Sequence, residues 1–272
     1  MHYATSRDGV RIHYVTEGNG RPLVLHHCLV GSHADWHSFG FVAGLRGRYR
    51  LILVDARGHG ASDKPPGPYS FEQLGQDILA VLDDQGIEQA HYYGYSLGGM
   101  VGWELGRQAP ERFLSMAIGG AQPYRQPVGA AERIAVMRHH LAQGMAAYVE
   151  WSESRVGAWP AEFRARALQH DAEALQAHLP ADPEVAYSVR FDDALERMTM
   201  PVLLLSGDRD EGHAGSRARR AAESLLDARF VEIPNADHFA LYASGERLVL
   251  PHLRAFLDGQ AAEAGLRKSR AA

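Results

Sequence analysis

A chain of 272 residues in which 46% are hydrophobic is long and apolar enough to bury one large α/β core or two small ones, which excludes an intrinsically disordered protein. Its formal net charge of −5 provides no basic surface for a polyanion, so we expect no nucleic-acid partner. The single cysteine, Cys28, excludes an intrachain disulfide and cannot form a zinc cluster alone.

The sequence shows no targeting or membrane segment. Residues 1–15 lack the apolar core of a signal peptide, and no stretch approaches the ~20 apolar residues of a spanning helix. We therefore expect a cytoplasmic protein without a membrane partner, present as a monomer or a homodimer.

The first predicted elements are strands. Residues 2–18 alternate polar and apolar side chains on both sides of Asp8-Gly9, which predicts a β-hairpin. Residues 21–31 and 49–60 are continuous apolar runs closed by glycine, which is typical of strands covered on both faces.

Helices and strands then alternate. A helix is predicted over 69–86, with Ser70 and Gln73 as a capping box and Gly86 as its stop. Strands are predicted over 90–95 and 113–121, with a helix between them that ends near Ala109-Pro110. Such alternation indicates a mostly parallel sheet.

The segment 122–199 differs in composition. Its stretches 129–157 and 160–179 are rich in Ala, Arg and Glu at helical spacing. We interpret it as a helical cap inserted into a core domain made of residues 1–121 and 200–272.

The C-terminal part returns to the alternating pattern. Strands are predicted over 200–210 and 228–238, followed by a closing helix over 245–259. We expect residues 261–272 to be a frayed tail.

The stretch Gly94-Tyr95-Ser96-Leu97-Gly98-Gly99 follows a predicted strand and precedes a predicted helix. The pattern G-x-S-x-G is weak alone, but a nucleophile elbow needs this strand–turn–helix context and small residues on both sides of the serine. The context therefore favours Ser96 as a nucleophile over a simple turn serine.

A serine nucleophile requires a base that is itself oriented by a carboxylate. Asp208 and Asp210 follow one late strand, and His238 ends the next. The order Ser…Asp…His is that of one hydrolase class and differs from the orders of two familiar serine protease classes. Asp208 stays an alternative to Asp210, as do His213 and His252 to His238.

These features resemble the α/β-hydrolase fold superfamily over nearly the whole chain. The resemblance is carried by the hairpin, "DARGHGASDKP" at 55–65, "GYSLGG", the Gly207-x-x-Asp210 turn and the "NADH" that ends in His238. It implies a mostly parallel eight-stranded sheet flanked by helices with an inserted helical cap. It also implies Ser96 as nucleophile, His238 as general base and acid, and Asp210 as the orienting carboxylate.

The stretches "HCLVGSHADW" and "GYSLGGMVGWELG" look most like the branch that contains small enol-lactonases and carboxylesterases. Such members hydrolyse esters or lactones without a cofactor. The oxyanion hole would use the backbone N–H groups of Leu97 and Leu29. Where the family often has His-Gly, this chain has His27-Cys28.

Several other residues are assigned by pattern. Candidates for the walls of the substrate pocket are Cys28, Tyr95, Tyr124, Trp151, Trp159 and Phe239. We expect Asp55 and Arg57 to brace their loop, with His59 as a further candidate for lining the site. Adjacent His139 and His140 on a helix make a poor chelate, and no metal site is predicted.

The hypothesis is a cofactor-independent serine hydrolase of a small ester or lactone, acting through an acyl-enzyme on Ser96. C–C bond hydrolysis and acyl transfer would use the same triad. A cofactor-free lyase or oxygenase would use the His238–Asp210 pair as base, and a non-catalytic receptor would only bind. Serine at 96 argues against dehalogenase or epoxide hydrolase chemistry, which needs an aspartate nucleophile.

Overall fold

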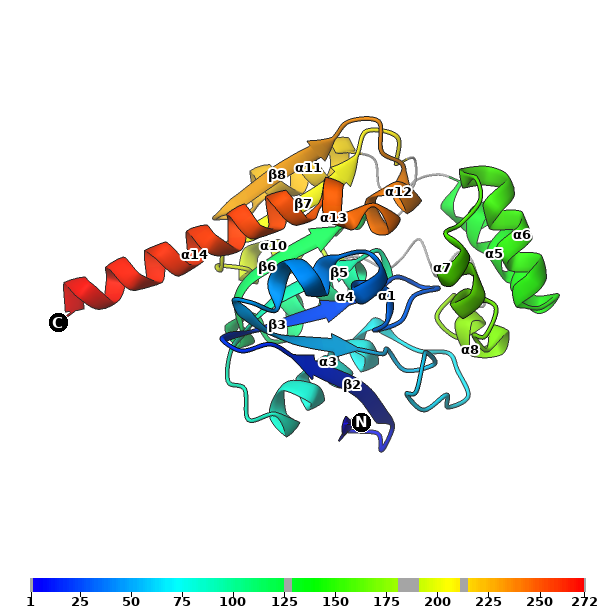
Figure 1. The fold of residues 1–272 in the computed structure, drawn as a ribbon, viewed down its shortest axis with the longest axis horizontal. Coiled ribbons are helices and arrows are strands. Elements are labelled where there is room, and N and C mark those ends of the chain that lie inside the picture. The colour runs from blue at the N-terminus through cyan, green and yellow to red at the C-terminus, as the bar shows by residue number, and fades with distance from the viewer. Residues whose placement is uncertain (1, 125–128, 181–190, 211–214, 272) are drawn as a thin grey trace.

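The computed structural model describes residues 2–124, 129–180, 191–210 and 215–271. Its strands form one eight-stranded sheet in the order β1-β2-β4-β3-β5-β6-β7-β8 (Figure 1). The hairpin of β1 (His2–Thr5) and β2 (Arg11–Glu17) is antiparallel, and β2 pairs antiparallel with β4 (Tyr49–Val54). The other pairings are parallel and involve β3 (Arg21–His26), β5 (Ala90–Tyr95), β6 (Phe113–Gly119), β7 (Val202–Gly207) and β8 (Ala228–Ile233). The predicted fold class is confirmed.

The apolar strands alternate between two cores, one on each face of the sheet. On β3, Leu23 and Leu25 pack into one core and Val24 into the other, as the period of two requires. The first core is covered by α1 (Asp35–Ser38), α2 (Phe41–Leu45), α12 (His238–Ala243), α13 (Gly245–Leu248) and α14 (Leu250–Ala271). The second is covered by α3 (Phe71–Asp84), α4 (Leu97–Gln108) and α11 (Gly215–Ser224).

The start of α3 matches the sequence prediction. The Ser70 hydroxyl accepts a bond from the Gln73 N–H at 3.1 Å, and the Gln73 side chain accepts one from the Ser70 N–H at 2.9 Å. This capping box satisfies two N–H groups that have no partner within the helix. The helix ends before Gly86, whose φ of +61° is easy only for glycine.

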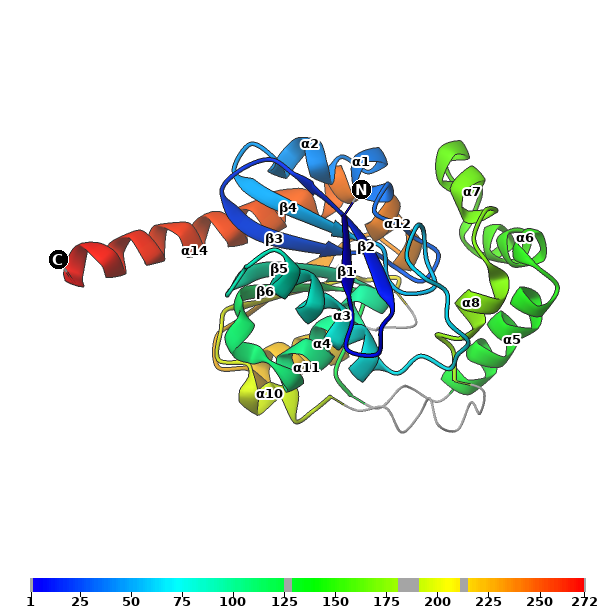
Figure 2. The same cartoon turned by 90° about the horizontal axis from the view of Figure 1, so that it is seen from below.

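Four helices follow β6 in the sequence and stand apart from the sheet, beyond the ends of its strands (Figures 1 and 2). They are α5 (Ala130–Ala142), α6 (Met145–Val156), α7 (Ala161–Ala167) and α8 (Ala172–Gln176), and we call them the cap. The short η1 (Pro110–Arg112) and α10 (Ala194–Arg197) belong to the body, where Met198 packs against Gly106 of α4.

The C-terminal region differs from the prediction. The closing helix is divided into α13 and α14, because Pro251 lacks an N–H and fits only in the first turn of a new helix. The expected frayed tail is also wrong, since α14 continues to Ala271 and projects away from the body (Figure 2). Among the described helices, none has the length and apolar character needed to span a bilayer.

Candidate active site

Ser96 lies in the tight turn between β5 and α4. Its φ of 54° and ψ of −107° are unusual for a residue with a side chain. A Cβ atom at Gly94 would lie 2.2 Å from the Gly98 carbonyl oxygen, and one at Gly98 would lie 2.2 Å from the His26 carbonyl oxygen. Only glycine fits at either position, so the turn holds the Ser96 hydroxyl above the end of the strand.

Three distant segments bring their side chains to this turn. The His238 Nε2 atom lies 2.9 Å from the Ser96 Oγ atom, and its Nδ1 atom lies 2.8 Å from Asp210 Oδ2. Asp210 follows β7 and is buried, whereas His238 opens α12 after β8. The hydroxyl can therefore donate to His238, and His238 can donate to Asp210.

Two of the three alternative residues, Asp208 and His252, do not occupy these positions. The carboxylate of Asp208 accepts a bond from the Ala236 N–H at 3.3 Å in the neighbouring loop. His252 lies in the first turn of α14, and His213 falls outside the described residues. The geometry thus favours Asp210 and His238 over the residues that compete with them in the sequence.

The charge of His238 is controlled by its neighbours. Burial lowers the pKa of His238, but the negative charges of Asp210 and Asp237 and the hydrogen bond to Asp210 outweigh it and raise that pKa above its ordinary value. The nearby guanidinium of Arg133 in α5 acts in the opposite sense and lowers it. The side chain of His238 keeps 38% of its surface accessible, so a substrate can reach the ring.

Tyr95 supports His238 rather than lining the pocket. Its hydroxyl donates to the His238 carbonyl oxygen at 2.5 Å, and its buried ring packs against His238 on one side and Tyr242 on the other, both at 5.3 Å between ring centroids. The N-cap Asp237 accepts a bond from the Ala240 N–H at 2.8 Å and fixes the start of α12.

The loop 27–31 lies beside the beginning of α4, because the His27 carbonyl accepts a bond from the Gly98 N–H at 3.1 Å. Among the described residues, no protein acceptor is found for the N–H groups of Leu97 or Leu29, so both predicted oxyanion donors are available. The Cys28 N–H instead donates to the Tyr242 hydroxyl oxygen.

Two buried histidines fix the loop 27–31 through hydrogen bonds. The imidazole of His59 donates to the Leu29 carbonyl at 2.5 Å, so His59 braces the loop. The Nδ1–H of His27 donates to the Cys28 carbonyl at 2.7 Å, while its Nε2 atom accepts from the Ala56 N–H at 3.1 Å. His27 thus joins the two loops, whereas the departure from His-Gly lies at the next residue, Cys28.

Most of the predicted pocket residues gather in one apolar cluster beside His238. Phe239 stacks on Trp159 at 5.4 Å, and Phe163 of α7 contacts both rings. Cys28 and Trp151 pack against the same cluster. Trp151 also stacks on His140 at 5.2 Å, at the outer side of the cap.

Tyr124 is the exception among the predicted pocket residues. It packs against the other core, together with Leu29, and its ring lies 4.8 Å from the guanidinium carbon of Arg220. The turn after β6 directs its side chain away from the cap cluster.

The cap is attached to the loops around the site by polar contacts that sequence reasoning missed. His170 donates to the Val30 carbonyl at 3.0 Å, and His178 donates to the Arg57 carbonyl at 2.9 Å. Arg166 of α7 forms an ion pair with Asp35 of α1. No local motif could have revealed these contacts, because each joins residues more than one hundred positions apart.

Within the part of the chain that the structure describes, one group of side chains has a spacing compatible with a metal ion. It consists of His13, His33 and Asp55. Both histidines direct Nδ1 at the Asp55 carboxylate, at 2.8 and 3.0 Å. Although burial opposes it, these bonds and the His33 charge keep the pKa of Asp55 far below its usual range. We interpret the group as a brace for the loop after β4.

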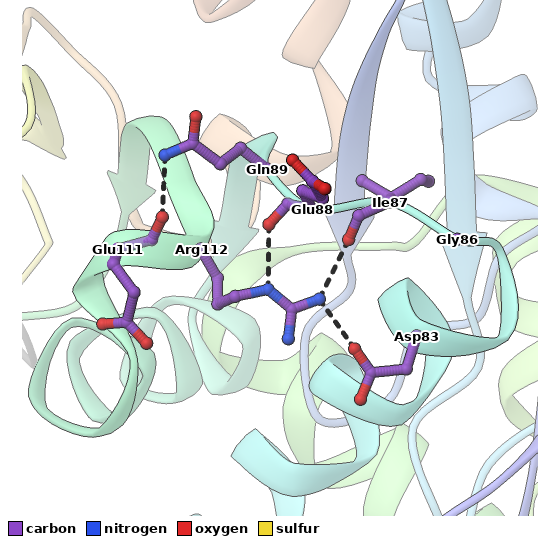
Figure 3. Close-up of a pocket in the computed structure, with 7 residues that line it drawn as sticks. All are labelled: Asp83, Gly86, Ile87, Glu88, Gln89, Glu111 and Arg112. Atoms are coloured by element: carbon purple, nitrogen blue, oxygen red, sulfur yellow. Dashed lines mark hydrogen bonds and ion pairs between the residues drawn. The ribbon is translucent and has the colours of Figure 1, made fainter.

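An open depression of about 530 Å³ lies at the other end of the strands (Figure 3). Its Arg112 guanidinium donates to the carbonyls of Ile87 and Glu88, both at 2.9 Å, and to Asp83 at 2.7 Å. The lining contains no nucleophile paired with a base. It is formed by Asp83, Gly86, Ile87, Glu88, Gln89, Glu111 and Arg112.

Comparisons with known proteins agree with this architecture. Residues 21–148 match the family described as alpha/beta hydrolase fold. RutD of Azorhizobium caulinodans, named as a carbamate hydrolase, is 29% identical over 248 residues, which are 88% of this chain and 91% of RutD. 3-Oxoadipate enol-lactonase 2 of Acinetobacter baylyi is 38% identical over 116 residues, or 42% of each chain. The crystal structure of the enol-lactonase from Burkholderia xenovorans LB400 superposes with a TM-score of 0.80 at 25% identity, covering 94% of this chain and all of that one.

Proposed function

Because the chain belongs to the α/β-hydrolase fold superfamily, we propose that it is a cofactor-independent serine hydrolase of a small ester or lactone. The observation that carries the proposal is the hydrogen-bonded chain from Ser96 through His238 to Asp210, at 2.9 and 2.8 Å. Such a chain turns a weakly nucleophilic hydroxyl into an effective one.

In the first half-reaction, the Ser96 oxygen attacks the carbonyl carbon of the substrate while His238 Nε2 takes the hydroxyl proton. The resulting imidazolium is stabilised by the Asp210 carboxylate. The N–H groups of Leu97 and Leu29 donate to the oxyanion. His238 then gives its proton to the leaving oxygen, and an acyl-enzyme remains.

In the second half-reaction, water attacks the acyl carbon while His238 again accepts the proton. When the oxyanion collapses, the bond from the acyl carbon to the Ser96 oxygen breaks, His238 gives its proton to that oxygen, and the acid is released. For a lactone, the leaving oxygen stays in the same molecule, so the product is a single hydroxy acid or its keto form.

The surroundings of His238 support a substrate with an apolar acyl group and an acidic substituent. The aromatic cluster of Trp159, Phe163 and Phe239 offers an apolar wall beside the reacting carbon. Arg133 is partly buried in α5, and its guanidinium has no ion pair with any described residue. A carboxylate on the substrate would satisfy this charge.

The test is covalent labelling with a fluorophosphonate probe, followed by location of the adduct by peptide mass. We expect stoichiometric labelling at Ser96, its loss in Ser96→Ala and strong slowing in His238→Ala. A panel of aryl esters, lactones and carbamates then ranks substrates, and carbamates are included because of the likeness to RutD. A folded protein that is neither labelled nor active on the panel would contradict the proposal and favour a base-only lyase, an oxygenase or a receptor.

A further inference from the structure

Asp35 is a buried carboxylate just after the loop that carries the candidate oxyanion donors. It lies in α1, and only 1% of its side chain is exposed. Its Oδ2 atom accepts bonds from the Ser32 N–H at 2.9 Å and the Tyr242 hydroxyl at 3.2 Å. Its Oδ1 atom accepts two bonds from Arg166, from Nε at 2.9 Å and Nη2 at 2.7 Å.

The donors to Asp35 come from three parts of the protein that meet at the site. Ser32 belongs to the turn that continues the loop 27–31, whose own fold is closed by the Gly31 N–H bond to the Cys28 carbonyl at 3.0 Å. Tyr242 lies on the helix that begins with His238, and Arg166 lies on the cap helix that carries Phe163. Asp35 is therefore the point at which the loop, the base-bearing helix and the cap are joined.

The loop has little freedom at this junction. A Cβ atom at Gly31 would lie 2.6 Å from the Tyr242 hydroxyl oxygen and 3.0 Å from Asp35 Oδ2. The Tyr242 hydroxyl and the Asp35 carboxylate therefore pack directly against the backbone of the loop at Gly31 and limit the positions that it can take. An ångström-scale displacement of groups that contact the reacting atoms can cost about 100-fold in rate.

The Arg166 guanidinium is the only full positive charge that bonds the Asp35 carboxylate among the described residues. A buried carboxylate is stable as an ion only when its charge is paired and its oxygens are hydrogen-bonded. When the cap moves away, Asp35 loses this partner, and the buried carboxylate must take up a proton, reorient towards water or release its other donors.

We propose that Asp35 is a positioning residue that couples closure of the cap to formation of the oxyanion hole. Arg166 is the cap residue through which this coupling acts. The proposal rests on the proposed hydrolase function and specifies which residues prepare the loop. Arg166 acts on the reaction through Asp35, without contacting the reacting atoms.

The kinetic test compares Arg166→Met, Arg166→Lys and Tyr242→Phe with the matched control Arg164→Met. Arg164 lies on the same helix, but its ion pair with Glu153 at 3.1 Å stays inside the cap. With an aryl acetate as substrate, we expect Arg166→Met to lower kcat about 10- to 100-fold with KM changed less than about threefold. Arg166→Lys should restore part of kcat, and the Arg164 variant should leave both constants unchanged.

A second readout does not depend on hydrolysis. Cys28 is the only cysteine in the chain, and burial raises the pKa of its thiol to about 12. Because the thiolate is the reactive form, this thiol should react slowly with a disulfide reagent such as dithiobis(nitrobenzoate). Release of the loop should accelerate the reaction about tenfold or more in Arg166→Met, but not in Arg164→Met. In Asp35→Asn the loss of the carboxylate charge also lowers the thiol pKa and adds to the acceleration.

The two readouts separate the failure of this proposal from the failure of the proposed function. The wild-type protein could hydrolyse no ester while Arg166→Met still accelerates the reaction of Cys28. That result would support the coupling of cap and loop and contradict the proposed hydrolase function. Equal Cys28 rates in Arg166→Met and Arg164→Met, or a change confined to KM, would overturn the coupling. If Asp35→Asn does not fold, the measurements on the Arg166 variants and Tyr242→Phe still test the coupling of cap and loop.

Discussion

At the scale of single residues, the proposed mechanism makes the ionisation of His238 decide when Ser96 can act. Its pKa is raised above 6.5, because Asp210 and Asp237 favour the imidazolium more than burial disfavours it. The base must be neutral, so kcat/KM should fall as pH decreases through a limb that lies above pH 6.5. A profile measured between pH 5 and 9 tests this expectation.

The variant Asp210→Asn is the control for this profile. It removes the charge that raises the His238 pKa, so the acid limb should move to lower pH, and activity should fall by roughly 10³- to 10⁴-fold. An acid limb that stays at the wild-type position in this variant would contradict the assignment of Asp210.

The backbone conformation of Ser96 also lowers the free energy of unfolding. A residue with φ of 54° and ψ of −107° is strained by about 1–3 kcal/mol unless it is glycine. Ser96→Gly should therefore increase the free energy of unfolding by about 1 kcal/mol relative to Ser96→Ala, although neither variant is active. Urea unfolding of the two proteins measures the difference, and a less stable glycine variant would show that the turn is relaxed.

At the scale of elements, strong local patterns were enough to predict the sheet. The strand positions, the Ser70 capping box and the elbow at 94–99 depend on short-range periodicity and turn chemistry, which a sequence displays directly. The triad positions followed from the rule that functional side chains gather after the ends of parallel strands. The break at Pro251 was missed, although the proline itself was a usable signal.

The attachment of the cap was not predictable from the sequence. Arg166 is one of several arginines in the inserted segment, and nothing local distinguishes it from Arg164. Its partner Asp35 is 131 positions away. Tyr124 was assigned to the pocket because it is aromatic, but the direction of a side chain after a strand depends on the turn that follows.

The cap helix α5 permits a prediction about charge. Arg133 lowers the His238 pKa, so Arg133→Met should move the acid limb of kcat/KM to higher pH. For an ester that carries a carboxylate, KM should rise about tenfold, as expected for the loss of one charge-assisted contact, while a neutral ester keeps its KM. An unchanged limb would mean that Arg133 does not face the site in solution.

At the scale of the whole molecule, buried histidines determine stability in acid. Burial lowers the pKa of six of them: to about 3 for His26, to about 4 for His91 and His170, and below 6.5 for His27, His59 and His178. The unfolded chain then binds more protons than the folded protein below pH 6.5. The free energy of unfolding should fall by several kcal/mol from pH 6.5 to 4.5, measured by urea unfolding.

Other groups act differently in this pH range. His33 and His238 have raised pKa values and oppose the loss, whereas Asp8 and Asp63 have lowered pKa values and weaken the fold only at more acidic pH. The variant His170→Gln keeps an amide donor near the position of Nε2 for the Val30 carbonyl and cannot be protonated, so its stability should depend less steeply on pH. A stability that is flat down to pH 4.5 would contradict the burial of these rings.

The order of the strands has a consequence for the newly made chain. Ser96 and its elbow belong to the centre of the sheet, whereas His238 follows β8 at the sheet edge, 142 residues later. During translation the serine is synthesised long before its base. A nascent or truncated chain that ends before residue 238 therefore carries the serine without its proposed base, and the proposed reaction cannot begin until β8 and the residues that follow it have been made.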